Sequence, residues 1–234
     1  MNRELFIEEV EKLGIVVDSE KLVKLDLFYK LLIEWNEKIN LTTIIDEELV
    51  YLKHFYDSLT LSRDINLNDE IKICDVGSGA GFPGIVLKIF FPNIDITLVD
   101  SLNKRIIYLN DIIEKLGLTK IKAIHTRMED FSKENEEKFD YITARAVAQL
   151  PILCEISVRA LKIGGSLVFM KANCDEELVG IEGKLKKLAL NISVIDRFIL
   201  PIEESNRTII KIDKYSKTDR FYPRTIDKIR KFLD

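Results

Sequence analysis

A glycine-rich stretch at residues 71–84, IKICDVGSGAGFPG, constrains the fold more than any other feature of this chain. The apolar residues that lead to Asp75 predict a short buried strand, and Pro83 with the apolar residues after it predicts a helix. A strand, a glycine loop and a helix in this order present free backbone N–H groups to a ligand. Glycine also lets the ligand approach closely, because it has no Cβ. The stretch therefore predicts a cofactor site at the end of a strand.

Two cofactors fit this loop. Residues 79–84 satisfy the dinucleotide pattern G-x-G-x-x-G, whereas D-x-G-x-G-x-G from Asp75 to Gly81 resembles the first motif of S-adenosyl-L-methionine (SAM) methyltransferases. The next strand ends at Asp100, about twenty residues past the loop, where a carboxylate binds ribose hydroxyls. Both cofactors contain a ribose, so Asp100 does not separate them. A dinucleotide loop would start two residues late and leave Asp75 without a role, which favours SAM.

The composition is that of an ordinary soluble globular protein. The 234 residues are 47% hydrophobic and 32% charged, which fits one large domain with a small appendage. No apolar run reaches the roughly eighteen residues of a membrane span, and the N-terminus has no signal-peptide core. Three cysteines without C-x-x-C spacing and two histidines predict neither disulfides nor a metal site. We expect a cytoplasmic protein without a metal.

The net charge of −4 argues against a basic surface over the whole protein, but the charge is uneven. Residues 1–50 hold twelve acids and six bases. Residues 207–234 hold nine bases and four acids, and we call this range the basic segment. A basic segment is either a solvated face or a local surface for RNA, and the sequence leaves both open.

Residues 3–60 are predicted to be helical. Apolar residues from Leu25 to Ile39 recur at spacings of three and four, as on one face of a helix, and Trp35 belongs to this face. A further helix is predicted to begin at Asp46, with His54 off its apolar side. We expect an N-terminal helical subdomain at residues 1–65 and a main domain at residues 66–234.

From residue 71 onward, strands and helices alternate, which is typical of an α/β fold. The predicted strands are 71–76, 94–100, 121–125, 139–143, 166–171, 191–199 and 206–213, with helices at 150–161 and 175–190. The last two strands are too close for a crossover helix, so they should pair antiparallel. We predict a Rossmann-like SAM-dependent methyltransferase with a mainly parallel seven-stranded sheet, one antiparallel hairpin and an N-terminal helical extension.

Arg145 lies just beyond the fourth predicted strand, beside the expected cofactor. Methyltransferases that act on exocyclic amines commonly carry Asn/Asp-Pro-Pro-Tyr/Phe there, but this chain has Ala144-Arg145-Ala146. None of the three cysteines falls on an active-site loop, where carbon methylation of pyrimidines would need one. An acceptor with its own lone pair, such as a ring nitrogen, remains. An arginine there can bind a guanine edge or the cofactor carboxylate, and an ion pair is the structural alternative.

Several motifs occur together in one order. They are WNEKINLT at 35–42, HFYDSL at 54–59, the glycine loop, TARA at 143–146 and YPR at 222–224. In combination they resemble the bacterial small-subunit (16S) ribosomal RNA guanine-N7 methyltransferases, the glucose-inhibited division protein B family. The resemblance implies SAM as cofactor and a guanine of small-subunit ribosomal RNA as acceptor. It also implies that Gly77, Phe82, Met128, Glu129 and Arg145 contact SAM.

From the loop and the resemblance together we predict the following site. The cofactor-binding residues are Gly77, Gly79, Gly81, Phe82, Asp100, Met128, Glu129 and Arg145. Arg145 is the catalytic candidate, and His54, Lys171 and Arg224 are the candidates for substrate binding. The partner is small-subunit ribosomal RNA or a small-subunit particle, and we expect a monomer. In the family the tail continues with a Gly/Pro-rich basic segment, whereas residues 225–230 here predict a short helix.

Three other functions compete with this interpretation: a SAM-dependent methyltransferase of a protein or small molecule, a nicotinamide-dependent oxidoreductase, and an inactive RNA-binding module. Bound-cofactor mass would separate the methyltransferases from the oxidoreductase. An inactive module would need a broken glycine loop, and this loop is intact.

Overall fold

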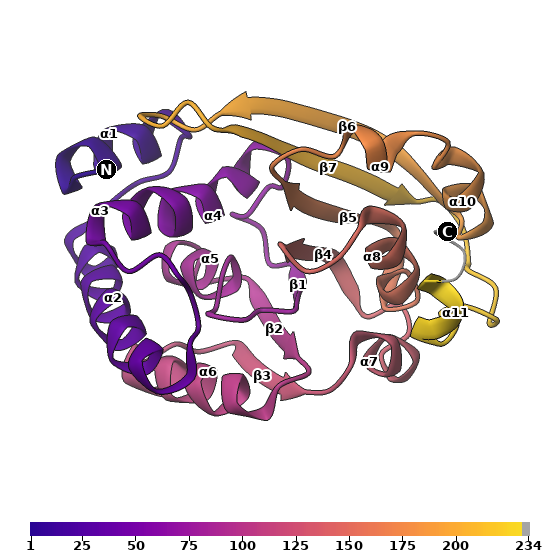
Figure 1. Cartoon of the computed structure of the whole chain (residues 1–234), viewed down its shortest axis with the longest axis horizontal. Coiled ribbons are helices and arrows are strands. Elements are labelled where there is room, and N and C mark those ends of the chain that lie inside the picture. The colour runs from indigo at the N-terminus through magenta and orange to yellow at the C-terminus, as the bar shows by residue number, and fades with distance from the viewer. Residues whose placement is uncertain (231–234) are drawn as a thin grey trace.

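A computed structural model describes residues 1–230, and within this range seven strands form one sheet in the order β3-β2-β1-β4-β5-β7-β6 (Figure 1). The strands are β1 Lys72–Val76, β2 Asp95–Asp100, β3 Ile121–His125, β4 Phe139–Arg145, β5 Leu161–Lys171, β6 Leu190–Ile199 and β7 Asn206–Lys214. Strands β1 to β5 are parallel, while β7 runs antiparallel to both of its neighbours, β5 and β6. The predicted Rossmann-like fold with one antiparallel hairpin is confirmed.

Helices cover both faces of the sheet (Figure 1). On one side lie α1 Arg3–Lys12, α2 Ser19–Ile39, α3 Glu47–Val50, α4 Asp57–Leu59, α5 Gly84–Phe90 and α6 Asn103–Lys115. On the other lie α7 Met128–Glu134, α8 Leu150–Ser157, α10 Glu182–Lys187 and α11 Ile226–Arg230, and the short α9 is Asp175–Leu178. Each face of the sheet packs its own cluster of buried apolar side chains, so the loops at the strand ends are held from both sides.

The N-terminal helices pack against the outside of α5 and α6. In α2, Leu25, Phe28 and Leu32 are fully buried, as the apolar spacing predicts. Trp35 is half-buried: its ring packs on Tyr108, and its Nε1–H donates a hydrogen bond of 2.7 Å to Asp111 of α6. These contacts join the helical part of the chain to the sheet through one apolar cluster.

The helix predicted from Asp46 differs from a regular α-helix. Asp46 is its N-cap, accepting a hydrogen bond of 3.0 Å from the Leu49 backbone N–H. After α3, however, residues Tyr51–Tyr56 form a π-helix, η1, and Thr60–Arg63 form a 3₁₀ turn, η2. The wider π turn changes which side chains face inward. The prediction that His54 lies off the inner face is therefore wrong, because His54 is only 9% exposed.

Two other elements differ in length from the prediction. Strand β5 was predicted at 166–171, but it begins at Leu161, which pairs with Phe139, and continues through Gly164 and Gly165. The helix predicted over 175–190 is two short helices, because Gly180 takes a φ of +67° between them. The short helix predicted at 225–230 is confirmed as α11.

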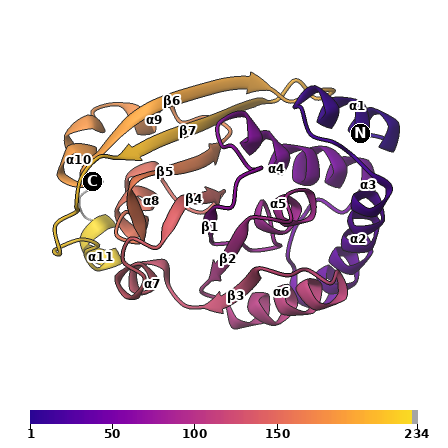
Figure 2. The ribbon, with the colours of Figure 1, turned by 180° about the vertical axis from the view of Figure 1, so that it is seen from behind.

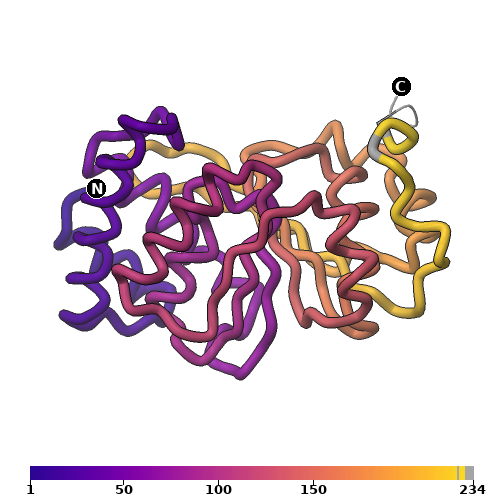
Figure 3. Tube along the Cα trace, turned by 90° about the horizontal axis from the view of Figure 1, so that it is seen from below, coloured from indigo at the N-terminus to yellow at the C-terminus, as the bar shows by residue number. Residues whose placement is uncertain are grey.

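The β6–β7 hairpin extends along the sheet edge to the N-terminal helices (Figure 2). Arg63 pairs with Asp196 of β6 at 2.5 Å, and Lys53 pairs with Glu203 of the hairpin loop at 2.9 Å. Helix α11, by contrast, lies at the end of the molecule opposite the N-terminal helices (Figure 3). Residues 231–234, the end of the basic segment, lie outside the described residues.

Candidate functional site

A cavity of about 320 Å³ opens at the carboxyl ends of the parallel strands. Its lining includes four predicted site residues: Gly77, Asp100, Met128 and Glu129. The other lining residues are Val76, Val99, Ser101, Arg105, Thr126, Arg127, Ala146, Val147, Ala148, Ile152 and Ile156. Open α/β sheets bind their ligands at this edge. We call this space the cofactor cavity.

The glycine loop follows β1 and turns sharply above the cavity. Gly77, Gly79 and Gly81 all have positive φ, and the Gly77 N–H donates a hydrogen bond of 2.7 Å to the Val99 carbonyl. A Cβ on Gly77 would meet Val147 at 2.7 Å, and one on Gly81 would meet Ile85 at 2.7 Å. A Cβ on Gly79 would meet only the Gly77 carbonyl, at 3.7 Å. Among these three glycines, Gly79 therefore has the most space where a Cβ would stand, although it is not one of the residues that line the cofactor cavity.

Asp100 ends β2 and fixes the loop. It is 2% exposed, and its Oδ2 accepts hydrogen bonds from the Gly79 N–H at 3.0 Å and from Arg105 at 3.2 Å. Its Oδ1 accepts one from the Leu102 N–H at 2.9 Å. A carboxylate offers about four acceptor positions, so Asp100 keeps one for a hydroxyl. The predicted ribose contact is compatible with this geometry, and Asp100 also holds the loop in place.

Asp75 lies behind the loop rather than in the cavity. It is fully buried, and its Oδ2 accepts a hydrogen bond of 3.0 Å from the Gly84 N–H at the start of α5. Its Oδ1 has no hydrogen-bond partner in the described part of the chain. Burial raises the pKa of Asp75 to about 7, because the site disfavours the charged form. The glycine loop is thus held by two carboxylates: Asp75 binds its Gly84 end inside the protein, and Asp100 binds Gly79 from the cavity side.

Met128 and Glu129 begin α7, directly after the loop that leaves β3. Met128 is 5% exposed and supplies an apolar wall, while the Glu129 carboxylate stands 3.9 Å from Arg127. The structure therefore brings an apolar surface and a carboxylate together opposite Gly77 and Asp100. An apolar wall and a carboxylate suit a purine ring with an exocyclic amine or a ribose hydroxyl.

Arg145, the last residue of β4, is held by the N-terminal helices. Its Nη1 donates to Asp57 Oδ2 at 2.9 Å and to the Lys53 carbonyl at 2.8 Å, and its Nη2 lies 3.1 Å from His54 Nδ1. Its guanidinium stands 5.2 Å from the Phe82 ring centroid. The side chain is only 14% exposed. Its Nε–H has no hydrogen-bond partner in the part of the chain that the structure describes, so a donor remains for a ligand.

His54 and Phe82 complete this cluster. Their rings stack with centroids 4.4 Å apart, and burial together with the Arg145 charge lowers the pKa of His54 to about 3. His54 Nδ1 lies 3.1 Å from Arg145 Nη2 and 3.2 Å from the Lys53 carbonyl. Arginine can only donate, so the contact with Arg145 favours the neutral tautomer that accepts through Nδ1 and donates through Nε2 to the Thr42 hydroxyl, 3.0 Å away. His54 is thus a support for Arg145 in this structure, and its predicted contact with substrate remains a prediction.

Asp57 is shared by two arginines. Its Oδ1 accepts a hydrogen bond of 3.0 Å from Arg207 of β7, in addition to the bond from Arg145 to Oδ2. Asp57 is 4% exposed. Sequence reasoning did not single out Asp57 or Arg207. The available signal was a carboxylate three residues after His54, inside an otherwise apolar helical run.

Lys171 lies at the end of β5 and holds the loop beside the cavity. Its Nζ donates to the Ala148 carbonyl at 2.8 Å and pairs with Glu177 at 2.9 Å. Arg224 lies on the other side of α8 from the cofactor cavity. It pairs with the buried Glu155 through Nε at 2.8 Å and Nη2 at 2.6 Å. The structure therefore does not bring Arg224 to the cofactor cavity, which is lined by four of the eight predicted cofactor-binding residues and not by Gly79, Gly81, Phe82 or Arg145.

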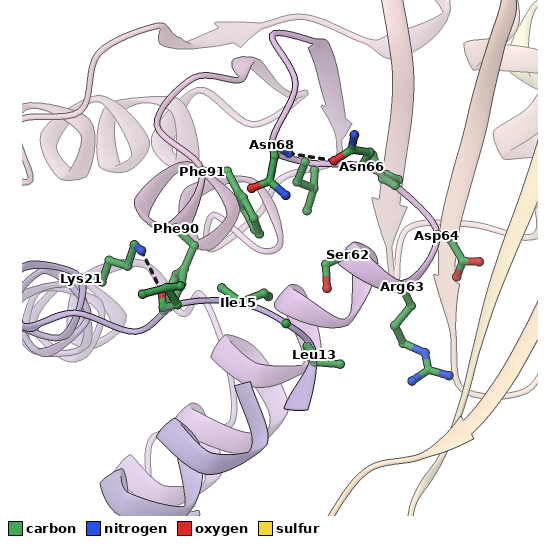
Figure 4. Close-up of a pocket in the computed structure, with 14 residues that line it drawn as sticks. Leu13, Ile15, Lys21, Ser62, Arg63, Asp64, Asn66, Asn68, Phe90 and Phe91 are labelled. Atoms are coloured by element: carbon green, nitrogen blue, oxygen red, sulfur yellow. Dashed lines mark hydrogen bonds between the residues drawn. The ribbon is translucent and has the colours of Figure 1, made fainter. Parts of the chain in front are cut away.

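A larger cavity, of about 500 Å³, lies elsewhere (Figure 4). It is lined by Leu13–Val16, the segment 62–68 and the end of α5, and it contains none of the predicted site residues. Figure 4 shows lining side chains of this cavity, among them Phe90, Phe91 and Ile15, and the hydrogen bond from the Asn68 N–H to the Asn66 side chain. It lies where the chain enters β1, which is the opposite edge of the sheet from the carboxyl ends. Topology therefore favours the smaller cavity as the cofactor site.

Within the described residues, neither a metal site nor a membrane-spanning helix is found. Among residues 1–230, no three His, Cys, Asp or Glu side chains are grouped so that they could hold a metal ion. None of the helices described is both long and apolar enough to cross a bilayer.

Comparison with known proteins gives concordant matches. The family model for rRNA small subunit methyltransferase G matches residues 21–206. The Ribosomal RNA small subunit methyltransferase G of Geobacillus sp. (strain WCH70) is 44% identical over 227 residues, which is 96% of this chain and 95% of that protein.

Solved structures show a similar fold at low sequence identity. A precorrin-6Y C5,15-methyltransferase from Geobacter metallireducens has a TM-score of 0.51 and 17% identity, with 75% of this chain and 92% of that one covered. A SAM dependent methyltransferase from Aquifex aeolicus has a TM-score of 0.50 and 17% identity, with 71% and 93% covered.

Proposed function

The chain belongs to the rRNA small subunit methyltransferase G family, and from this premise we propose that it transfers the methyl group of SAM to N7 of one guanine in small-subunit ribosomal RNA. The observation that carries the proposal is the cofactor cavity. It gathers Gly77, Asp100, Met128 and Glu129 at the carboxyl ends of the parallel strands, under a loop that is open at Gly79.

The residues present fit SAM. The open side of Gly79 admits the methionine part, Asp100 keeps an acceptor position for a ribose hydroxyl, and Met128 with Glu129 suits the adenine. SAM supplies an electrophilic methyl group when it is bound. Guanine N7 carries its own lone pair, so its methylation needs no general base, and the contribution of the protein is alignment.

Arg145 is the residue proposed to provide this alignment. Asp57, the Lys53 carbonyl and His54 fix its guanidinium, so the free Nε–H points in a set direction without loss of side-chain freedom when the ligand binds. A preorganised guanidinium can donate to the O6 edge of guanine or to the carboxylate of the cofactor. Phe82 and the π-helix η1 hold it from one side.

The proposal extends to the setting of the reaction. The partner is small-subunit ribosomal RNA, free or in a particle, and the enzyme acts in the cytoplasm as a monomer, since one chain supplies every element of the cavity described above. We also propose that the two parts of the chain have different roles. Residues 66–234 form the methyltransferase domain, and the helical residues 1–65 position Arg145 through Asp57.

Calorimetry with Gly79→Ala tests the cofactor assignment. Its Cβ projects into open space, so the change should abolish most SAM binding at a folding cost of only about 1–2 kcal/mol for the strained φ of +54°. Gly117→Ala is the matched control: the φ of Gly117 is +60°, nothing lies within 4 Å of an added Cβ, and Gly117 does not line the cofactor cavity. Equal SAM affinity in the two variants, or binding of a nicotinamide dinucleotide and not of SAM, would contradict the assignment.

Mapping of N7-methylguanosine tests the product. Borohydride and aniline cleave RNA at N7-methylguanosine, so ribosomal RNA from cells that lack the gene should lose one cleavage site in the small subunit. The wild-type gene should restore the site, and a gene encoding Arg145→Ala should restore it poorly. Retention of every cleavage site after deletion would show that the acceptor is a different atom or a different molecule.

A further inference from the structure

Helix α8 forms a wall of two cavities. Ile152 and Ile156 line the cofactor cavity, while Pro151 and Glu155 line a second cavity of about 220 Å³ on the other side. Consecutive positions in a helix point about 100° apart, and a helix is about 10 Å across. A substrate that is a chain, with one unit in front of the cofactor cavity, therefore has the second cavity within reach across one helix. We call the second space the tail cavity.

Aromatic side chains from the segment before α11 form one wall of the tail cavity. Phe221 is 63% exposed, and its ring meets that of Tyr222 edge-to-face with centroids 5.3 Å apart. The ion pair between Arg224 and Glu155 lies beneath and ties this segment to α8. A large exposed aromatic ring on a fixed segment, beside an apolar hollow, is a stacking platform for a planar ring.

Cations form the opposite wall. Lys184 and Lys187 of α10 line the tail cavity, and Lys186 is exposed on the same short helix. Within the described residues none of the three has a carboxylate within 4.0 Å. Such lysines match the phosphates of a polyanion.

The basic segment itself provides less of this surface than its composition suggests. Arg207 binds Asp57, Lys211 binds the Asp64 carbonyl, Lys214 binds the Val158 and Leu161 carbonyls, and Arg224 binds Glu155. These four bases are committed to holding the fold. At the tail cavity, exposed charge comes instead from Lys184 and Lys187 of α10.

We propose that the tail cavity binds a nucleotide of the substrate RNA that lies close to the methylated guanine, with its base on Phe221 and its phosphates at Lys184 and Lys187. This inference rests on the proposed function, because it takes the substrate to be RNA. The combination of an exposed ring with unpaired cations favours RNA over a peptide: stacking accepts any base, and the lysines follow the backbone. The tail cavity thus gives an acidic protein a local surface for a polyanion.

Charge reversal at two lysines tests the proposal. In Lys184→Glu/Lys187→Glu, KM for small-subunit RNA should rise by about tenfold, and the slope of log affinity against log salt should flatten by about 1.4 for two lost phosphate contacts. SAM affinity, melting temperature and turnover at saturating RNA should stay at wild-type values, because neither lysine lines the cofactor cavity.

Lys30→Glu/Lys122→Glu is the matched control. It changes the charge by the same amount at two exposed positions, on α2 and β3, that line neither cavity. A KM and salt slope shared by the two double variants would overturn the proposal, since only net charge would then matter. An unchanged KM in the Lys184/Lys187 variant would also overturn it and leave the tail cavity to a protein partner.

A fluorescent reporter tests the stacking directly. Phe221→Trp places an indole in the wall of the cavity, and Trp35, the only natural tryptophan, serves as a constant background. A single-stranded oligoribonucleotide should quench the new emission saturably without SAM, and less so when Lys184 and Lys187 are also replaced by Glu. Absence of quenching would contradict the stacking. If the oligoribonucleotide quenches the emission but the protein methylates no RNA, the proposed function is wrong, while the proposal that the tail cavity binds RNA is supported.

Discussion

Two arginine–carboxylate pairs, Arg145 with Asp57 and Arg224 with Glu155, are alike in burial and different in use. In each the arginine side chain is 14% exposed and the carboxylate 5%. Arg224 makes two side-chain hydrogen bonds to Glu155 and a third from its backbone N–H. Arg145 makes one bond to Asp57, and Asp57 also binds Arg207.

The difference separates a buried ion pair that stabilises the fold, Arg224 with Glu155, from one that positions a hydrogen-bond donor, Arg145 with Asp57. Glu155 depends on one arginine for its neutralisation, whereas Asp57 would retain Arg207 if Arg145 were removed. The Arg145 side chain in turn contacts His54, the Lys53 carbonyl and Phe82 as well as Asp57. The Arg224 pair should therefore report on stability and the Arg145 pair on turnover.

The largest expected effect is that of Arg224→Ala on stability. The change leaves the buried Glu155 carboxylate without its side-chain partner, which costs about 3 kcal/mol in pairs of this kind. Urea denaturation followed by circular dichroism measures the loss. Arg220→Ala, at an exposed position of the same segment, is the control and should be close to wild type. Equal stability of the two variants would remove the structural assignment of the pair.

The second prediction concerns pH and the histidine of the Arg145 cluster. The pKa of His54 falls from an unfolded value near 6.5 to about 3 in the fold. Its contribution to stability is therefore complete above pH 6.5 and is lost as the pH falls toward 3. Relative to His54→Gln, the wild type should lose about 2 kcal/mol of unfolding free energy between pH 7 and pH 5.

Comparison with the variant matters because other groups titrate in the same window. Asp75, with a folded pKa of about 7 and an ordinary unfolded value, acts in the opposite direction: its folded form holds the proton longer, so stability falls as pH rises from about 4 to 7. Both proteins share this term, and it cancels in their difference. Parallel stability curves for wild type and His54→Gln would show that His54 is not buried as a neutral ring.

The third prediction is that Arg145→Ala lowers turnover by on the order of tenfold or more, about 1.4 kcal/mol of barrier, with little change in melting temperature. Asp57 keeps Arg207, so no buried carboxylate is left unpaired. Single-turnover methylation of small-subunit RNA at saturating SAM measures the effect. Wild-type turnover would reduce Arg145 to a structural ion pair, and a large drop in melting temperature would make the two pairs equivalent.

The smallest expected effect separates charge from geometry in the Arg224 pair. Arg224→Lys keeps the charge but cannot make two parallel bonds to Glu155, so stability should fall by about 1 kcal/mol. Urea denaturation of the Lys and Ala variants side by side provides the measurement. A lysine variant as unstable as the alanine variant would mean that shape, rather than neutralisation, keeps Glu155 buried.

The sequence predicted the sheet because each strand carries its own signal. Apolar residues before Asp75 and Asp100, glycines after them, and a hairpin too short for a crossover were enough to place all seven strands and their directions. The predicted length of a strand was wrong where glycines were compatible both with a strand end and with a continuing strand. The fifth strand was predicted to begin at residue 166, after Gly164 and Gly165, but β5 passes through both glycines, with Leu161 already paired to Phe139.

The site was predicted in part, for a similar reason. Residues that the loop pattern or the resemblance marked, such as Gly77, Asp100 and Met128, meet in one cavity. The partners of Arg145 could not be predicted, because no local pattern links position 145 to Asp57 or Asp57 to Arg207. The π-helix that turns His54 inward leaves no periodic signal either. Arg224 was predicted to bind substrate because it belongs to the YPR motif. The motif shows the positive charge but not the Glu155 carboxylate that Arg224 binds in the fold.

The position of Arg207 has a consequence for a chain still being made. It follows Asp57 by 150 residues and lies on β7, the strand that fits between β5 and β6 after both have been synthesised. At 5–20 residues per second, Asp57 leaves the ribosome about 8–30 s before Arg207 does. During that interval the nascent protein has an incomplete sheet and an Asp57 that lacks one of its two cations. A copy that is released before residue 207 therefore has the glycine loop and the direct partners of Arg145, but its Asp57 lacks the second arginine that binds it in the complete fold.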